Sequence, residues 1–372
     1  MKNVLIKNVG KVITGNTPSK SKEEFYASAD IGFVKPDIIN DSGISFIKEG
    51  SEYISENARA IARIVGKESI FVTCIGSIGK IGIALCDLAF NQQINAIVPN
   101  ERVIPKYLAY CLCHNKSRLV HMANAPVVPI INKTQFENFS ISICENVEEQ
   151  KRIVRILDIV SEIISKRQQE MVKLDDLIKS RFVEMFGDPV SNPKKWKIVK
   201  VIDVCDCMVP GRDKPRSFTG SIPWITIDDL IINGVTIESK KNLGLTKNEI
   251  SEVKRKVIPV NSVIMSCVGN LGLCSIAGKE LIMNQQLHSF QCKKDISEYY
   301  LMFYLGYRTD YMSKFASSTT VSYMNKTICN SIPVMLPPVI LQNQFADFVQ
   351  QVDKSKLLYK SPWIKHKNYS IA

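Results

Sequence analysis

The chain has 372 residues, 45% hydrophobic and 23% charged, a composition typical of a globular protein of about two domains. No apolar run reaches the roughly 18 residues that a membrane span needs, and the first residues do not form a signal peptide, so we expect a cytoplasmic protein without a membrane partner. Eleven scattered cysteines and four histidines show no zinc-site or catalytic-triad spacing, which argues against a metal site. The formal net charge of +12 favours a polyanionic partner, nucleic acid above all.

The first 145 residues predict a lobe of mixed strands and helices. Phe33–Ile39 predicts a strand followed by a turn, and Ile70–Ile75 predicts a β-branched strand that ends in a G-x-x-G turn. Pro105–Asn115 is aromatic-rich and helical in pattern, and Ser140–Ile143 predicts a closing strand. The alternation of these elements predicts an α+β lobe.

Glu145–Gly187 predicts one long helix, because no Pro or Gly interrupts it before the stop signal at Gly187-Asp188-Pro189. At 1.5 Å per residue, about 40 residues make a rod of roughly 60 Å. Its apolar residues recur at alternating spacings of four and three, the pattern of a coiled-coil seam. These are Ile153, Leu157, Val160, Ile164, Met171, Leu174, Ile178 and Met185, with Arg167 and Arg181 at the other seam positions. An ordinary surface helix is the alternative, but it would carry a wider apolar stripe.

The part of the chain after this helix repeats the part before it. Ile70–Asn100 aligns without a gap on Val263–Lys293, at a constant offset of 193 residues. The offset places Asn91-Gln92-Gln93 on Asn284-Gln285-Gln286, and Asn132-Lys133-Thr134 on Asn325-Lys326-Thr327. A register held over so many residues indicates a duplication, so we predict two lobes of the same fold.

A second, shorter helix is predicted at Val339–Tyr359. Its apolar face consists of Phe345, Phe348, Val349 and Val352, and Ser361-Pro362 ends it at about half the length of the first rod. In each copy the closing strand leads into a helix with a glutamine near its start, Gln150 in the first and Gln344 in the second.

The two features that both lobes share are interpreted as structural. The G-x-x-G turn lacks the rest of a dinucleotide or P-loop motif, so a backbone turn is favoured over a nucleotide site. The same turn is also a candidate for approaching a phosphate through Lys80 in the first lobe or Asn270 in the second. The Asn-Gln-Gln triplets suit adenine edges, but lobes that read different sequences should differ at reading positions, so a shared hydrogen-bond network is favoured.

Positions that differ between the lobes are better candidates for base contacts. Residues 15–22 and 211–217 are equivalent loops, rich in glycine, proline, basic and small polar residues, and such side chains suit guanine or adenine edges and phosphates. The candidates are Asn16, Thr17, Ser19, Lys20 and Lys22 in the first loop and Arg212, Lys214 and Arg216 in the second. A solvated basic loop without a DNA role is the equally weighted alternative. Lys133 and Lys326, shared by both lobes, are candidate phosphate contacts.

Several stretches resemble those of the specificity subunits of type I restriction–modification systems. They are Glu184–Pro189 with Asn192-Pro193 and Trp196, Leu341–Phe348, and the G-x-x-G and Asn-Gln-Gln core of each repeat. The resemblance implies two mixed α/β target recognition domains separated by long helices that form an antiparallel coiled-coil spacer. It also implies double-stranded DNA as ligand, two methyltransferase subunits as partners with restriction subunits as optional further partners, and no catalytic residues, metal or cofactor.

On this resemblance we expect target recognition domains at 1–145 and 188–338, spacer helices at 146–187 and 339–361, and an irregular tail at 362–372. The short second helix departs from the family pattern. It leaves open an alternative, a stand-alone or truncated DNA-binding scaffold that no longer recruits a methyltransferase. An enzyme with an unrecognised site is a further alternative. It is disfavoured because the Asn-Gln-Gln triplets are not followed by the prolines of an amino-methyltransferase motif.

Overall fold

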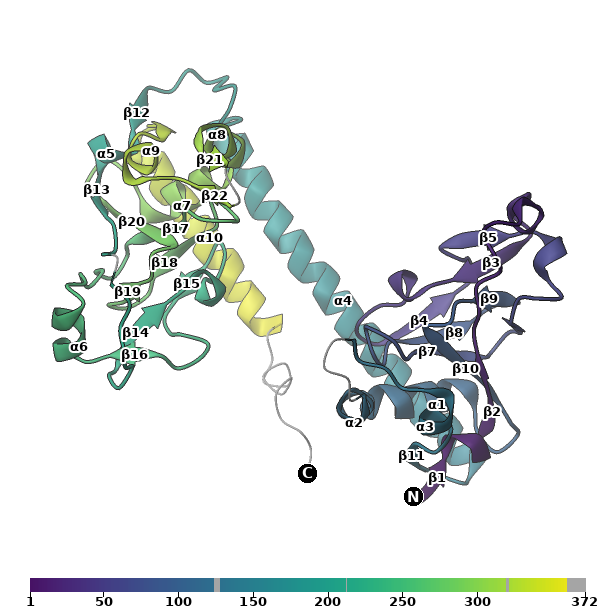
Figure 1. The fold of residues 1–372 in the computed structure, drawn as a ribbon. Helices are drawn as coiled ribbons and strands as arrows, with labels where there is room; N and C mark the ends of the chain where they lie inside the picture. The colour runs from purple at the N-terminus through teal and green to yellow at the C-terminus, as the bar shows by residue number, and fades with distance from the viewer. Residues whose placement is uncertain (124–127, 212, 319–320, 360–372) are drawn as a thin grey trace. The chain divides into compact units, whose positions relative to one another are not determined.

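The computed structural model describes residues 1–123, 128–211, 213–318 and 321–359 (Figure 1). The chain divides into two compact units, Met1–Ser165 and Lys166–Ala372, and the boundary falls inside the longest helix. Arg212 and the predicted tail lie outside the described residues. None of the helices in the described part of the chain has the length and apolarity to cross a membrane.

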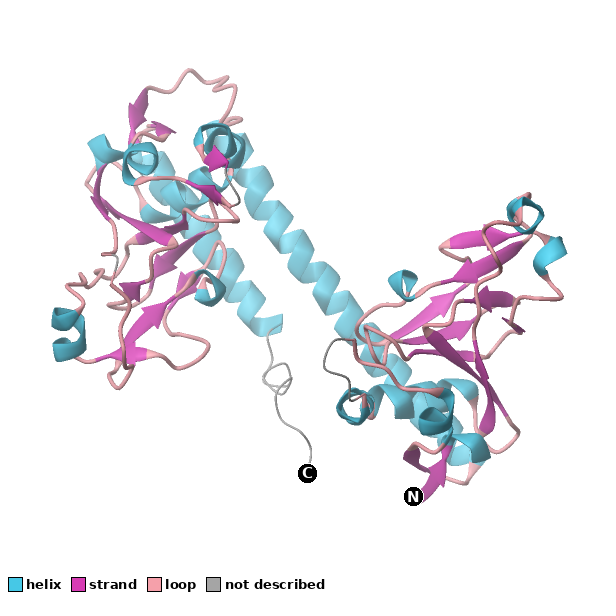
Figure 2. Ribbon diagram, in the orientation of Figure 1, coloured by secondary structure: helices cyan, strands magenta, loops and turns pink. Residues whose placement is uncertain are grey.

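Within its described residues the first unit contains three sheets, whose strands come from distant parts of the sequence. Figure 2 draws these strands in magenta. In spatial order the five-stranded sheet contains β2 (Gly10–Thr14), β10 (Ile94–Pro99), β7 (Ile70–Thr73), β8 (Ile81–Ala84) and β4 (Ile44–Ile47). The four-stranded sheet contains β5 (Glu52–Ile54), β3 (Ile31–Val34), β9 (Leu88–Phe90) and β6 (Ile64–Val65). A two-stranded sheet joins β1 (Lys2–Leu5) to β11 (Ser140–Ile143), so the start of the lobe pairs with its end.

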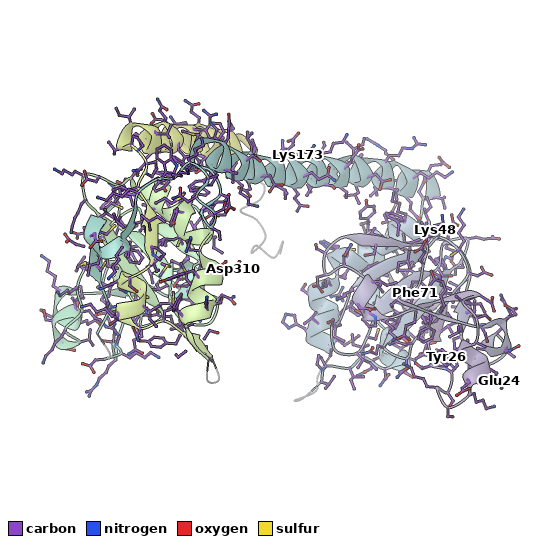
Figure 3. All side chains as sticks on the ribbon, turned by 90° about the horizontal axis from the view of Figure 1, so that it is seen from above. Glu24, Tyr26, Lys48, Phe71, Lys173 and Asp310 are labelled. Atoms are coloured by element: carbon purple, nitrogen blue, oxygen red, sulfur yellow. The ribbon has the colours of Figure 1, made fainter. Side chains whose placement is uncertain are left out.

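The core of the first unit lies where these sheets meet the helices. Phe71, which Figure 3 labels, and Phe90 are fully buried among the strands, with ring centroids 5.2 Å apart. The short helices are α1 (Pro105–His114), α2 (Lys116–Met122) and α3 (Lys133–Glu137). Apolar residues of α1 are buried against β8 and β11, and Ile153 and Val154 of the long helix pack on the same core.

The second unit repeats this topology, which confirms the predicted duplication. Its five-stranded sheet contains β13 (Cys205–Met208), β20 (Leu287–Cys292), β17 (Val263–Ser266), β18 (Cys274–Ala277) and β15 (Val235–Thr236). In both units the last strand of this order runs parallel to its neighbour and the other pairs are antiparallel. The smaller sheets contain β16 (Gly244–Leu245), β14 (Ile222–Ile225) and β19 (Ile282–Met283); β12 (Ile198–Lys200) and β23 (Pro333–Met335); and β21 (Ser317–Ser318) and β22 (Ser322–Tyr323).

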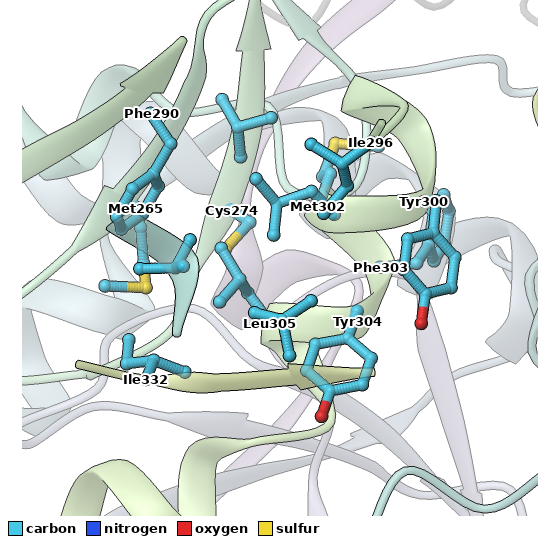
Figure 4. Close-up of a cluster of buried hydrophobic side chains, with 14 of the residues drawn as sticks. Met265, Cys274, Phe290, Ile296, Tyr300, Met302, Phe303, Tyr304, Leu305 and Ile332 are labelled. Carbon is cyan, nitrogen blue, oxygen red and sulfur yellow. The ribbon is translucent and has the colours of Figure 1, made fainter. Parts of the chain in front are cut away.

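Most helices of the second unit contribute to its largest core. These are α5 (Val201–Val204), α7 (Glu298–Gly306), α8 (Thr309–Phe315), α9 (Lys326–Asn330) and α10 (Val339–Tyr359). The remaining short helix, α6 (Lys247–Glu252), packs in a separate small cluster through Ile250. Leu305 of α7 faces Met265 and Phe290 of the five-stranded sheet (Figure 4). Tyr300 and Tyr304 lie on the other side of α7, where their hydroxyls donate to the carbonyls of Met335 and Pro333 in β23. The start of α10 at Val339 agrees with the start predicted from the sequence.

The predicted long helix is α4 (Val147–Phe186), one continuous element of 40 residues. It ends where Gly187 adopts a φ of +80°, a conformation that favours glycine. Trp196 then donates its Nε1 hydrogen to the carbonyl of Phe186 at 2.8 Å, and Lys194 caps two further carbonyls. The motif after the helix is therefore a cap for its last turn.

Within the second unit, α10 packs antiparallel to the last part of α4. Phe345, near the start of α10, contacts Phe182 and Phe186 near the end of α4. Lys356, near the end of α10, forms an ion pair with Asp175 at 2.7 Å, earlier along α4. The predicted antiparallel pair is present there, but its α4 side differs from the predicted seam, because Phe182 and Phe186 fill the interface and Arg181 lies over the ring of Phe348.

Candidate nucleic-acid interface

The Asn-Gln-Gln triplets form the same hydrogen-bonded turn in each lobe. Asn91 donates from Nδ2 to Oε1 of Gln93 at 2.8 Å, and Asn91 Oδ1 accepts from the Gln93 backbone at 3.1 Å. Asn284 and Gln286 repeat both bonds at the same distances. The predicted structural role of the triplets is thereby confirmed for the first and third residues.

The G-x-x-G turns are also structural. Gly76, Gly79, Gly269 and Gly272 all have φ between +71° and +77°, which confirms the turn. Lys80, a candidate phosphate contact, is turned inward: its side chain is only 14% exposed and pairs with Asp41 at 3.2 Å. The Asn270 side chain is exposed and stays available for a ligand.

The candidate loop of the first lobe divides into anchoring residues and exposed residues. Asn16 donates to the carbonyl of Ile61 at 3.0 Å and accepts from the backbone of Arg63 at 2.7 Å. Thr17 donates to Oε1 of Gln92 at 2.7 Å. These two side chains hold the loop against the rest of the lobe, so an adenine edge would have to displace existing bonds at Asn16. The exposed candidates are Ser19, Lys20 and Lys22.

The equivalent loop of the second lobe is anchored by different residues. Arg255 is 7% exposed, stacks 5.1 Å from the ring centroid of Trp224, and donates to the carbonyl of Asp213 at 2.6 Å. Glu249 accepts from Ser217 at 2.6 Å and from the Thr219 backbone at 3.2 Å. These hydrogen bonds, with Ser217 first, lower the pKa of Glu249 to about 2.

Lys214 and Arg216 of this loop are exposed, and Arg212 lies outside the described residues. The two lobes thus fix equivalent loops through unrelated side chains. Sequence analysis missed Arg255 and Glu249 because both lie about 30 residues or more beyond the loop that they hold.

The shared lysines begin equivalent short helices. Lys133 is the first residue of α3 and Lys326 is the first residue of α9, and each follows an asparagine whose side chain caps the helix. Lys133 lies 3.5 Å from Glu137, and it lines a groove with Lys11 and Arg63 that sequence analysis did not identify. The repeat carried a signal for Arg63, since a lysine, Lys256, stands at the matching position 193 residues later.

The helix face next to the first lobe is largely uncovered. Aligning Gln150 with Gln342 places Ile153, Leu157 and Val160 of α4 on Phe345, Val349 and Val352 of α10. In the second unit the last part of α4 covers that face, and Val352 is 7% exposed. In the first unit Val160 is 45% exposed, and the exposed apolar residues continue along the helix as Ile156, Ile159, Ile163 and Ile164. The predicted seam is therefore only partly packed in the described residues.

In the described residues no three His, Cys, Asp or Glu side chains lie close enough together to hold a metal ion. A family model described as "Type I restriction modification DNA specificity domain" matches residues 1–174 and 193–361. The chain belongs to this family. The match covers both lobes, α10 and most of α4, which agrees with the duplication seen in the fold.

Curated members of the specificity family are similar to this chain over most or part of its length. The MjaIX specificity subunit of Methanocaldococcus jannaschii is 22% identical over 93% of this chain and 85% of its own length. The EcoR124I/EcoR124II specificity subunit of Escherichia coli is 30% identical over 40% of this chain and 38% of its own.

A solved type I S subunit from M. genitalium has a similar fold, with a TM-score of 0.55 and 14% identity over 96% of this chain and 91% of that one. A structure described under complex assembly and conformational transition of the type I R-M system has a TM-score of 0.53 and 16% identity, with the same coverage. These likenesses support the assignment of the fold.

Proposed function

We propose that this chain is the non-catalytic DNA-specificity subunit of a type I restriction–modification complex, acting in the cytoplasm, with each lobe reading one half of a bipartite target. The observation that carries the proposal is the repetition of one framework with different loops. Both lobes keep the Asn-Gln-Gln turn and the strand order, whereas residues 15–22 and 211–217 differ in sequence and in anchoring. A shared framework with different reading loops suits a target whose two halves differ in sequence.

The proposed target recognition domains are residues 1–145 and 188–338. In the first, the exposed Ser19, Lys20 and Lys22 are the proposed DNA contacts, with Asn16 and Thr17 holding their loop. In the second, Arg212, Lys214 and Arg216 have this role, and arginine suits guanine edges or phosphates. Lys133, Lys326 and Asn270 are proposed contacts to the DNA backbone. Lys80 is a weaker proposal, because it already pairs with Asp41.

The long helices are the proposed spacer and docking site. The face of α4 that carries Ile153, Leu157 and Val160 is equivalent to the face of α10 that the second unit buries under a helix, and the exposed isoleucines of α4 lie beside it as an apolar stripe. We propose that a helix of a methyltransferase subunit covers this stripe, with two such subunits per complex and restriction subunits joining them. The second unit supports a helix as the occupant. There the last part of α4, a helix with large apolar side chains, packs on the equivalent face of α10.

The test is methylome sequencing of cells that express this chain with its cognate methyltransferase subunit. We expect a methylated motif of two defined parts separated by unspecified bases. Replacing Lys214 and Arg216 should alter one part only. A motif that is contiguous, or no methylation by a complex that assembles, would contradict the proposal.

A stand-alone DNA-binding scaffold is the second candidate, favoured by the unequal helices: α10 has 21 residues in the described part of the chain and α4 has 40. Co-purification separates the two candidates. Recovery of the methyltransferase subunit with wild-type protein, and its loss with Ile159→Asp, supports the first. Tight DNA binding without recovery of any methyltransferase supports the second.

A further inference from the structure

The first lobe has a basic groove between the edges of its two larger sheets. Strand β2 lies at one end of the five-stranded sheet and β6 lies at one end of the four-stranded sheet. The groove encloses about 500 Å³ and is lined by both strands and by Lys11, Arg63 and Lys133. Asn16 joins its two walls at one end, through its bonds to the backbone of Ile61 and Arg63.

The cations of this groove are only partly neutralised. Lys11 and Arg63 are exposed, and neither forms an ion pair within the described residues. Lys133 shares its charge with Glu137 at 3.5 Å. A lone exposed lysine is commonplace, so exposure alone does not indicate a ligand. The comparison with the second lobe provides the stronger argument.

The strand registers identify the matching positions in the second lobe. Val12 pairs with Ile97 and Cys207 pairs with Phe290, which aligns Lys11 with Asp206. Val65 pairs with Leu88 and Ile258 bridges Leu281, which aligns Arg63 with Lys256. The constant offset aligns Asn100, Lys133 and Glu137 with Lys293, Lys326 and Asn330.

At these five positions the residues change but the balance of charge does not. The first lobe has Lys11, Arg63 and Lys133 with one carboxylate, that of Glu137. The second lobe has Lys256, Lys293 and Lys326 with one carboxylate, that of Asp206, which pairs with Lys293 at 3.5 Å. Each lobe therefore has a surplus of two positive charges, although three of the five positions differ in charge. Base-reading residues should differ between the lobes, whereas contacts to the sugar–phosphate backbone serve both lobes equally.

We propose that the groove of the first lobe and its counterpart in the second bind DNA phosphates, and that Lys11, Arg63, Lys256 and Lys293 are sequence-independent contacts. The inference rests on the proposed DNA-binding function and adds these residues to it. The reading loops begin directly after β2 and β13, so a phosphate held in each groove would fix the position of the duplex relative to its loop.

The test measures the affinity of the full chain for a fluorescein-labelled random-sequence duplex of about 30 bp, by anisotropy, between about 50 and 200 mM KCl. Each phosphate contact contributes roughly 0.9 to the slope of log affinity against log salt. Lys11→Gln with Arg63→Gln should lower the slope by about 2, and Lys256→Gln with Lys293→Gln should do the same. The matched control, Lys48→Gln with Lys67→Gln, replaces two exposed lysines of the first lobe outside the groove and should leave it unchanged.

A second pair of variants should strengthen binding to the duplex, a result that a misfolded variant would not give. Glu137→Gln and Asp206→Asn each remove the one carboxylate among the five compared positions of a lobe and should raise affinity severalfold at low salt. A slope that is unchanged in the Lys11 and Arg63 variant, or equally lowered in the control, would overturn the inference. So would carboxylate variants with wild-type affinity. Failure of the wild-type chain to bind any duplex would instead overturn the proposed function itself.

Discussion

Gln150 and Gln342 make the same three hydrogen bonds at the starts of two helices 192 residues apart. Gln150 donates to the carbonyls of Arg102 at 3.0 Å and Cys144 at 2.8 Å, and accepts from the backbone of Ile104 at 2.8 Å. Gln342 donates to the carbonyls of Asp295 at 3.2 Å and Pro337 at 2.8 Å, and accepts from Ser297 at 2.9 Å. Both side chains are fully buried, so each amide joins a lobe to the helix that follows it.

Replacing Gln342 with alanine should destabilise the second unit by about 2–4 kcal/mol, because buried backbone groups lose their partners. Urea unfolding followed by circular dichroism measures the change. Gln344→Ala is the matched control, since that side chain is exposed on the same helix and its loss should change stability by less than about 0.5 kcal/mol. Equal effects of the two variants would contradict this role for Gln342.

Sequence reasoning identified the repeat and the helices, because the alignment of the two copies and the spacing of apolar residues can both be read from the sequence itself. It matched Gln150 with Gln344 rather than Gln342, since two glutamines lie within one turn of α10 and only the hydrogen bonds of the folded chain distinguish them. It also placed Arg181 in the helix seam, which Phe182 fills. The heptad rule assumes a symmetric pair of helices, whereas this part of α4 packs on α7 as well as on α10.

The sequence predicted which loops belong to the candidate site, but it did not predict the contacts that their side chains make. Loop composition identified residues 15–22 and 211–217, yet the role of Asn16 as an anchor depends on backbone groups some 45 residues away. The basic groove depends on which strands lie at the edges of the sheets, and local sequence patterns do not reveal that order. Lys11 and Arg63 are 52 residues apart in the chain and meet only through the folded sheets.

Phe182 is the central side chain between α4, α7 and α10. It is fully buried, and its ring centroid lies 4.9 to 5.7 Å from those of Phe186, Tyr300, Tyr307 and Phe345. Phe182→Ala should cost about 3–5 kcal/mol in the free energy of unfolding, because it removes aromatic contacts and leaves a cavity. Val183→Ala, at a neighbouring position that is 42% exposed, should cost little. Hydrogen exchange of α10 should accelerate in the first variant only, and unchanged protection there would contradict the packing.

His288 should make the second unit sensitive to acid. It is buried, with Nε2 lying 3.1 Å from Oδ1 of Asn330, and burial lowers the pKa of His288 to about 4. The unfolded chain binds a proton near pH 6.5 and the folded chain does not, so stability falls as the pH drops from about 6.5 towards 4, by roughly 3 kcal/mol in all.

Asn95 occupies the position equivalent to His288 in the first lobe and accepts a hydrogen bond from Thr14 at 2.7 Å. His288→Asn therefore introduces a residue that the same fold already holds at this position. The variant should lose most of the fall in stability between pH 6.5 and pH 4, as followed by thermal unfolding at each pH. A pH profile identical to that of the wild type would show that His288 is not the group responsible.

Replacing the exposed loop residues of one lobe should weaken recognition of only one half of the target. Lys214→Ala with Arg216→Ala removes two exposed cations from the second loop and leaves Arg255 and Glu249 to hold it in place. Lost base contacts typically cost about 1–3 kcal/mol each, so discrimination at one half of the target should fall by tenfold or more. Lys20→Ala with Lys22→Ala should have the same effect on the other half. Binding to target libraries randomised in one half at a time measures each effect, and equal loss in both halves from either variant would show that the lobes do not read separately.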